Sequence, residues 1–207
     1  MVDSEVQLDA ADFDRMAWLH VDSIDDSLPA LLGVGFSDRL YRFLARSPDE
    51  TLFPERVDGR IESVCVLSFA PASLHGRILR GTLPVLVLHA LSAFVMRPDF
   101  RTFLRRSVAE ARRDVESPAA PEITYIFTNG RLRGHGLGAR LLARVETYLR
   151  DRGETACFVK TLDTADNRAI AFYEENGFAP IGTRAEAGRR FVQFQKPIPG
   201  SDRLPKS

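Results

Sequence analysis

The sequence predicts a single domain that contains both helices and strands, and three observations support this prediction. The chain has 207 residues, a length that one domain commonly reaches. Apolar residues make up 44% of the chain and charged residues 27%, as in ordinary globular proteins. Segments with helical spacing of apolar residues are interspersed with β-branched and aromatic segments. We therefore expect one α/β domain over residues 1–197, followed by a flexible tail at 198–207.

The charge and the cysteine content narrow the possible functions. Lys plus Arg and Asp plus Glu each number 28, so no net charge attracts the chain to nucleic acids or anionic membranes, and neither partner is expected. Cys65 and Cys157 each lie in an apolar, strand-like run and are expected to be buried thiols, which favours a reducing compartment. The acidic N-terminal stretch lacks the features of a secretory signal. These observations predict a cytoplasmic protein.

Two helices are expected before the first hairpin. Val6–Leu8 has the character of a short first strand, and Asp12 is the expected cap of the first helix. This helix carries apolar positions at helical spacing: Met16, Leu19, His20 and Ile24. The second helix is expected at 36–44, with Ser37 as its cap and Pro48 beyond its end.

The next part of the chain combines a hairpin with a helical insertion. Asp58-Gly59 between two β-rich runs is typical of a tight hairpin turn, so strands are expected at 51–56 and 61–69. Residues 70–121 are rich in Leu and Arg at helical spacing and predict the insertion. Its most apolar part, Pro84–Met96, is shorter than the roughly 20 residues of a membrane-spanning helix. This part would suit a buried helix or, if it is exposed, the surface of a homodimer.

The last third of the chain alternates between strands and helices. Ile123–Thr128 is β-branched and aromatic, and a glycine-rich loop then leads into a helix that runs from Leu137 to about Arg152. Gly153 is expected to end this helix. The remaining expected elements are a strand at 155–162, a helix within 163–176 that Gly177 ends, and strands at 178–183 and 190–196.

The loop Arg133-Gly134-His135-Gly136-Leu137-Gly138 carries the clearest functional signal. Its glycines lie between a strand and a helix, where backbone N–H groups can approach phosphate oxygens and the helix N-terminus adds partial positive charge. Gly134-x-Gly136-x-x-Ala139 also fits the dinucleotide fingerprint, but the loop comes late in the chain and the acidic partner, Glu154, precedes its strand instead of ending it. A nucleoside-triphosphate loop is excluded because no Gly-Lys-Ser/Thr follows.

Two motifs together resemble the GNAT family of acyl-CoA N-acyltransferases. Arg133-x-x-Gly136-x-Gly138 resembles the pyrophosphate loop of that family. The segment from Arg168 to Phe178 is an Ala-rich helix that bears Tyr173 and ends in Gly-Phe, and it resembles the second signature. The resemblance spans Ile123–Phe178. It implies a mixed, mostly antiparallel central sheet flanked by helices, with the helical insertion between the third and fourth strands, and it implies acetyl-CoA as co-substrate with an amine acceptor.

The resemblance also implies a role for each matching residue. Backbone N–H groups of the loop would hold the pyrophosphate of acetyl-CoA. The sheet would open between the strands that end at Thr128 and Leu162, leaving a strand edge that pairs with the pantetheine arm. Tyr173 would protonate the departing thiolate, and no metal is expected. The implied cofactor-binding residues are Ile126, Phe127, Thr128, Arg133, Gly134, His135, Gly136, Leu137, Gly138, Ala139 and Asp166.

The sequence departs from the family pattern in three places. Asp166 stands where the family usually has Asn, and Asn167 follows it. Thr161 stands where some relatives carry a glutamate base, so the base is left open among Glu122, Asp163 and His75. Glu62-Ser63 stands where relatives commonly have glycine. These departures keep a second interpretation open, in which the chain is a non-catalytic acyl-CoA sensor or assembly module of the same fold.

The resemblance implies direct transfer, in which an uncharged amine attacks the thioester carbonyl and backbone N–H groups stabilise the oxyanion. No acyl-enzyme is needed. The helical insertion would cover the acceptor side of the cleft, which suits a small molecule such as an amino sugar or an amine metabolite. A peptide N-terminus or a protein lysine is the alternative acceptor and would require a more open groove.

Overall fold

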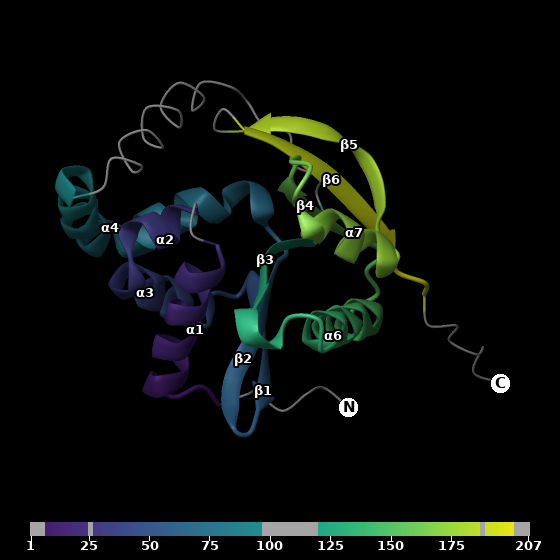
Figure 1. Cartoon of the computed structure of the whole chain (residues 1–207), viewed down its shortest axis with the longest axis horizontal. Coiled ribbons are helices and arrows are strands. Elements are labelled where there is room, and N and C mark those ends of the chain that lie inside the picture. Colours follow the sequence, from purple (N-terminus) through teal and green to yellow (C-terminus); the bar gives the residue numbers. More distant parts are fainter. Residues whose placement is uncertain (1–6, 25–26, 97–119, 187–188, 201–207) are drawn as a thin grey trace.

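The chain folds around one six-stranded sheet, which the computed structural model shows between two groups of helices (Figure 1). The structure describes residues 7–24, 27–96, 120–186 and 189–200. The strand order is β1-β2-β3-β4-β6-β5, and every neighbouring pair is antiparallel except β3 and β4. The strands are β1 Glu50–Val57, β2 Arg60–Ser68, β3 Glu122–Thr128, β4 Ala156–Leu162, β5 Ala179–Glu186 and β6 Arg189–Pro197. The predicted mixed, mostly antiparallel sheet is therefore confirmed.

Helices cover both faces of the sheet and bury two apolar clusters against it. The helices are α1 Ala10–Ser23, α2 Leu28–Leu32, α3 Val34–Leu44, α4 Pro71–Met96, α6 Leu137–Asp151 and α7 Arg168–Glu175, with a 3-10 turn η1 at Gly130–Leu132. α1 and α3 bury one cluster, which includes Phe36 and Tyr41, while α6 and α7 bury the other, which includes Leu141 and Phe194. Figure 1 shows these two groups of helices on opposite sides of the sheet.

The predicted insertion is helical over the part that the structure describes. α4 runs from Pro71 to Met96 and packs beside α2 and α3, whereas 97–119 lies outside the described residues. Among the described helices, none is long and apolar enough to cross a membrane. Val87 and Phe94 are about half exposed, so part of the Pro84–Met96 segment is accessible, and a homodimer through this surface stays a prediction.

The strand expected at Val6–Leu8 is not found in the part of it that the structure describes. Gln7 and Leu8 have no strand structure, and Val6 lies outside the described residues. The prediction that Asp12 caps α1 is also wrong, because Asp9 is the cap. The two aspartates form a capping box, with the Asp12 N–H donating to Asp9 Oδ1 over 2.8 Å and the Asp9 N–H donating to Asp12 Oδ2 over 3.1 Å. β1 is therefore the first described strand. The insertion, expected between the third and fourth strands, follows the second described strand, because α4 lies between β2 and β3.

The start of α3 also differs from its prediction. The helix begins at Val34, after Gly33, whose positive φ of 93° turns the chain directly out of the short α2. Ser37 is therefore inside the helix and does not cap it. Its side chain is buried, and its hydroxyl donates to the Pro29 carbonyl over 3.1 Å.

Turn and boundary signals elsewhere agree with the structure. Asp58 and Gly59 both have positive φ values, 51° and 78°, as a tight hairpin turn between β1 and β2 requires. Helix α6 ends before Gly153, which also has positive φ. Ile198, placed at the start of the expected tail, is 4% exposed and its N–H donates to the Thr155 carbonyl over 2.9 Å. Core packing therefore extends one residue past the expected domain boundary.

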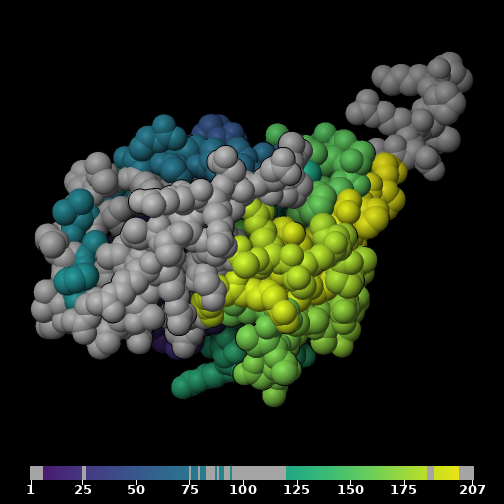
Figure 2. All heavy atoms as spheres, turned by 90° about the horizontal axis from the view of Figure 1, so that it is seen from above, coloured from purple at the N-terminus to yellow at the C-terminus, as the bar shows by residue number. Residues whose placement is uncertain are grey.

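The C-terminal hairpin completes the sheet. β5 pairs with β6, and β6 pairs along the whole of β4. In the space-filling view of Figure 2, the residues of β5 and β6 lie on the side of the molecule away from the described residues of α4. The sheet thus has two halves, β1 to β3 and β4 to β6, that are joined through β3 and β4.

A buried histidine fixes the junction between α1 and α2. His20 is fully buried, with its Nδ1 2.6 Å from the Tyr41 hydroxyl and its Nε2 2.9 Å from the Ser27 hydroxyl. Its ring also packs against Tyr125 and Phe127 of β3. Burial lowers the pKa of His20 to about 3, so the imidazole is neutral in the folded protein at physiological pH.

This burial makes stability depend on pH in a predictable direction. Because the folded pKa lies below the ordinary value of 6.5, the unfolded chain takes up a proton as the pH falls through about 6.5, while the folded chain does not. We expect the free energy of unfolding to fall by roughly 2 kcal/mol between pH 7.5 and pH 5 on account of His20. In urea denaturation at both pH values, His20→Gln should lose that much less than the wild type, whereas His135→Gln, at an exposed position, should match it. Equal losses in wild type and His20→Gln would contradict the assignment.

Candidate functional site

The sheet opens between β3 and β4 shortly after these strands meet. Their pairing comprises Glu122 with Phe158 and Ile123 with Val159, yet β3 continues to Thr128 and β4 to Leu162. Beyond the pairing, β3 stays with β2 and β4 stays with β6, and Figure 1 shows the two halves of the sheet diverging. The predicted splayed edge is therefore present. Ile126, Phe127 and Thr128 lie along it, on the unpaired side of β3.

The glycine-rich loop lies at the end of this open edge. After β3, the chain makes the η1 turn and then the loop, in which Gly134 and Gly136 have positive φ values of 82° and 77°. Gly136 is the N-cap of α6, and no side chain of the described residues caps this helix. The N–H groups of the first helical turn have no acceptor inside the helix. They are therefore available to an anion at the positive end of the helix dipole.

The three loop glycines meet two different structural requirements. At Gly134 and Gly136 an added Cβ would meet nothing within 4 Å, so positive φ is the constraint there. At Gly138 an added Cβ would lie 3.0 Å from Cζ of Phe172, a residue of α7. Gly138 therefore allows α6 and α7 to approach each other closely, which brings the two sequence motifs together.

The side chains of the loop point to different environments. Leu137 is 2% exposed and anchors the start of α6 in the core. Arg133 and His135 are exposed, and His135 Nδ1 lies 3.1 Å from the Arg133 carbonyl oxygen. Ala139 is partly buried. Two basic side chains are thus exposed beside the free N–H groups, where they would favour a negatively charged ligand.

Tyr173 is the buried residue of α7 and lies in the core. Its side chain is 4% exposed, and its ring packs against Phe172, Phe178 and Phe194. Burial raises the pKa of its phenol well above the ordinary value of 10.0, so the hydroxyl stays protonated at physiological pH. The structure thus provides a neutral phenol in apolar surroundings. This state suits a proton donor and is also that of a core tyrosine.

Asn167 joins the start of α7 to the end of β4. Its side-chain oxygen accepts from the Ala169 N–H over 3.0 Å and caps the helix, while its amide donates to Thr161 Oγ1 over 2.9 Å and to the Leu162 carbonyl. Asp166 is exposed in the preceding turn. The polar residue that holds this junction is therefore Asn167, one position after the expected site. The sequence signal for it was an Asn immediately before a helical run.

Two of the three candidate bases, Glu122 and Asp163, have described side chains, and they lie at opposite ends of the β3–β4 region. Glu122 begins β3, where the strands are paired, and its carboxylate lies 3.9 Å from Lys160 Nζ. Asp163 directly follows β4, at the open end, and pairs with Arg190. The side chain of His75 is outside the described ones. Position therefore favours Asp163 over Glu122.

Neither thiol is suited to nucleophilic catalysis. Cys65 and Cys157 are both free and buried, as predicted. Burial raises the pKa of the Cys65 thiol well above its ordinary value and that of Cys157 to about 12. Thiolates at these positions are therefore rare at neutral pH. Within the described residues, no group of three or more His, Cys, Asp or Glu side chains could hold a metal ion.

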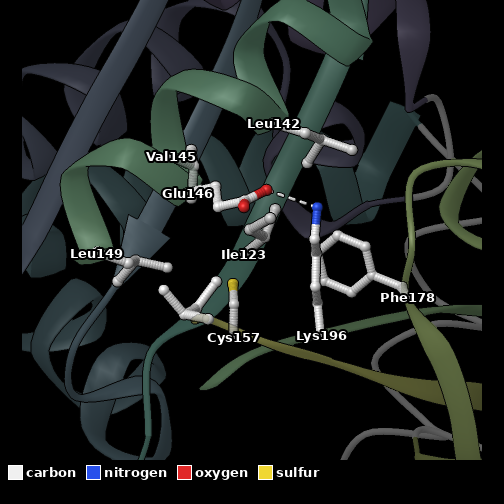
Figure 3. A pocket seen from close by; sticks show the side chains of 9 residues that line it. Ile123, Leu142, Val145, Glu146, Leu149, Cys157, Phe178 and Lys196 are labelled. Atoms are coloured by element: carbon white, nitrogen blue, oxygen red, sulfur yellow. Dashed lines mark hydrogen bonds and ion pairs between the residues drawn. The ribbon is translucent and has the colours of Figure 1, made fainter. Parts of the chain in front are cut away.

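Two hollows lie away from the loop. A gap of about 10 Å³ under α6 is lined mainly by apolar side chains, including Ile123 and Cys157, and is crossed by an ion pair of 2.6 Å between Glu146 and Lys196 (Figure 3). It has room for about one water molecule. A groove of about 1,100 Å³ lies between α3 and α4 and is lined by Arg39 and Arg80, among others. Neither hollow includes the open edge of β3 or the glycine loop.

Comparisons with known proteins agree with this arrangement. A solved acetyltransferase has 19% sequence identity, with 92% of this chain and 97% of that chain covered and a TM-score of 0.62. The ribosomal-protein-S18-alanine N-acetyltransferase of Escherichia coli has 13% identity, 96% coverage of both chains and a TM-score of 0.56. PaiA N-acetyltransferase of Thermoplasma acidophilum, solved with coenzyme A, has 12% identity, 92% and 95% coverage and a TM-score of 0.55. The chain therefore has the fold of the GNAT acetyltransferases.

A sequence comparison gives the same family. Residues 106–178 match the Acetyltransferase (GNAT) family, and this region includes the glycine loop and the helix that bears Tyr173. None of the proteins of curated function matches the sequence significantly. The family match therefore covers the two motifs that carry the resemblance, and the whole chain has the fold of the GNAT acetyltransferases.

The contact between Gly138 and Phe172 can be tested by a double-mutant cycle. Gly138→Ala should cost about 1 kcal/mol more in the wild-type background than in a Phe172→Leu background, because the smaller side chain removes the steric contact. The free energy of unfolding in urea measures both. Gly182→Ala, where an added Cβ meets nothing within 4 Å, should cost the same in either background. Additive effects of Gly138→Ala and Phe172→Leu would show that Gly138 is not required for this packing.

Proposed function

We propose that the chain is an acetyl-CoA-dependent N-acetyltransferase that moves an acetyl group onto a primary amine. The observation that carries the proposal is the continuity of two features. The unpaired edge of β3 ends at a loop whose helix N-terminus has free N–H groups. An amide-rich arm can pair with the edge while its phosphates reach the loop.

Each part of acetyl-CoA has a matching set of groups in this proposal. The pantetheine amides pair with the backbone of Ile126-Phe127-Thr128. The pyrophosphate accepts from backbone N–H groups between Gly134 and Ala139, with the exposed Arg133 and His135 beside it. Asp166, exposed before α7, lies next to the arm. The structural neighbour from Thermoplasma acidophilum was solved with coenzyme A, which is consistent with this assignment.

The proposed chemistry is direct transfer. An uncharged amine attacks the thioester carbonyl, a backbone N–H group at the open edge stabilises the oxyanion, and the carbon–sulfur bond breaks as the carbonyl re-forms. The Tyr173 hydroxyl gives its proton to the departing thiolate. The amine proton passes to Asp163 or to water. The raised thiol pKa values of both cysteines argue against a covalent acyl-enzyme.

The proposed acceptor is a small molecule, such as an amino sugar or an amine metabolite. The proposal assumes that the helical insertion, whose described part α4 packs beside α2 and α3, covers the acceptor side of the cleft and narrows it. The alternative acceptor is a peptide N-terminus or a protein lysine, which would need a wider groove.

A second candidate function is an acyl-CoA sensor or assembly module without transferase activity. Two observations favour it. Tyr173 is 4% exposed among aromatic rings, and Thr161 occupies the position where some relatives have a glutamate base. In this alternative, Tyr173 serves the core and the cofactor site binds without turnover.

Calorimetry with acetyl-CoA and a thiol-release assay separate these functions. For the proposed enzyme we expect binding of acetyl-CoA and release of CoA thiol with at least one amine from a panel of amino sugars, polyamines, lysine and an N-terminal peptide. Binding without thiol release from any amine would favour the sensor. Binding of NADH in place of acetyl-CoA would contradict both.

The role of Tyr173 can be tested against a neighbouring tyrosine. Tyr173→Phe should lower kcat by roughly 100-fold and leave the dissociation constant of acetyl-CoA unchanged. Tyr148→Phe, which removes a hydroxyl from the same apolar cluster, should leave kcat unchanged. A general acid loses its proton only above its folded pKa, and burial raises the pKa of Tyr173 above 10.0. We therefore expect no fall in kcat from deprotonation of Tyr173 between pH 7 and pH 10. A wild-type kcat in Tyr173→Phe would remove this residue from the mechanism.

A further inference from the structure

A buried polar cluster lies at the end of β3, where the chain enters the glycine loop, on the side of β2 and α1. It consists of Arg15 from α1, Glu62 from β2 and Asn129, which directly follows β3; we call it the Glu62 cluster. One carboxylate oxygen of Glu62 accepts from both Arg15 Nη2 and Asn129 Nδ2, the latter over 2.6 Å. Arg15 Nε also donates to the Ile61 carbonyl over 3.0 Å. Three elements that are distant in sequence thus meet at one carboxylate.

The Glu62 cluster is shielded from solvent. The side chains of Arg15 and Glu62 are each 10% exposed. Losing one partner of a charge pair so far removed from water is costly. Arg60, an exposed arginine whose Nε lies 4.0 Å from the other carboxylate oxygen of Glu62, compensates that carboxylate only weakly. The contacts therefore constrain the position of Asn129 more firmly than a surface ion pair would.

Asn129 passes this constraint to the glycine loop through a series of hydrogen bonds. Its N–H donates to the Glu62 carbonyl over 2.8 Å, which extends the β2–β3 ladder by one residue. Its side-chain oxygen accepts from the Arg131 N–H over 3.2 Å, and its carbonyl accepts from the Leu132 N–H over 2.8 Å. The Leu132 carbonyl then accepts from the His135 N–H over 3.3 Å. The path leads from Glu62 into the middle of the loop.

Ser63 adds a second attachment at the same place. Its hydroxyl donates to the Phe127 carbonyl over 2.8 Å and lies 2.7 Å from Thr128 Oγ1. The pair Glu62-Ser63 therefore holds the last residues of β3 and the residue that follows them. Glycines at these two positions would supply none of these side-chain contacts.

We propose that Arg15 and Glu62 are positioning residues that hold the loop 130–139 in the conformation that binds the pyrophosphate of CoA. This inference rests on the proposed function. Neither side chain needs to touch the cofactor, because both act through Asn129 and the η1 turn. A loop that is already held in its binding conformation loses less conformational entropy when the ligand binds.

The test compares two arginines that both join α1 to the β1–β2 hairpin. Arg15→Ala breaks the Glu62 cluster. Arg56→Ala breaks a pair with Asp12 that has two contacts, of 2.7 and 2.8 Å. Among the described residues, no hydrogen bond of Arg56 or Asp12 reaches the loop. Glu62→Gln is the milder third variant, since it removes the charge and keeps the shape, and it serves if Arg15→Ala does not fold. The measurements are calorimetry with CoA, amide hydrogen exchange over 129–139, and the melting temperature.

We expect the CoA dissociation constant to rise roughly ten- to hundredfold in Arg15→Ala, with faster hydrogen exchange confined to 129–139. Glu62→Gln should show a smaller change in the same direction. Arg56→Ala should lower the melting temperature without changing either loop measurement. A wild-type CoA affinity in both cluster variants, or an equal loss in Arg56→Ala, would overturn the positioning role. Failure of the wild-type protein to bind CoA would overturn the proposed function instead, while hydrogen exchange would still report whether the cluster orders the loop.

Discussion

The early end of pairing between β3 and β4 is the constraint on which the rest of the site depends. A parallel pair that continued to Thr128 would use the backbone groups of β3 within the sheet and leave nothing for a ligand. Because the pairs stop at Ile123 and Val159, β3 has one satisfied edge and one free edge. Buried backbone groups without partners are costly, so a free edge in the middle of a sheet indicates a site that a ligand or water completes.

Each half of the sheet is held in place by its own contacts once the pairing ends. On the β3 side, Ser63 and the Glu62 cluster attach the end of the strand to β2 and α1. On the β4 side, the strand is paired along its length with β6, and Asn167 attaches its end to α7. The opening is therefore bounded by two rigid walls.

The sequence predicted the elements whose signals are local. The hairpin at Asp58-Gly59 and the helix after the glycine loop depend on neighbouring residues, and both have the predicted form. The errors occurred where two local signals compete. Asp9 and Asp12 both favour a helix start, and the capping box uses both, with Asp9 as the cap. Ser37 also resembled a cap, but Gly33 begins the helix earlier because its positive φ allows the turn.

The contacts that organise the site could not be predicted from the sequence. Glu62 was recognised as a departure from the family pattern, but its partners Arg15 and Asn129 lie far from it along the chain. Such a cluster depends on the register between β2 and β3, which a single sequence does not specify. Asn167 was visible as a polar residue shifted by one position, but its role as the cap of α7 was not predicted. The roles of Tyr173 and of the loop residues toward acetyl-CoA stay predictions.

The burial of Tyr173 bears directly on whether it can act as an acid. A thiol with an ordinary pKa near 8.5 is a stronger acid than a phenol whose pKa has been raised above 10, so proton transfer from Tyr173 to a solvated thiolate would be unfavourable. The same apolar surroundings act on sulfur, however, since burial raises the pKa of the neighbouring Cys157 thiol to about 12. A coenzyme thiolate formed beside Tyr173 would be desolvated in the same way, and its proton affinity would rise with that of the phenolate. Desolvation of both groups therefore raises both pKa values and leaves their order unchanged, so the role of Tyr173 as an acid stays a prediction that the kcat of Tyr173→Phe tests.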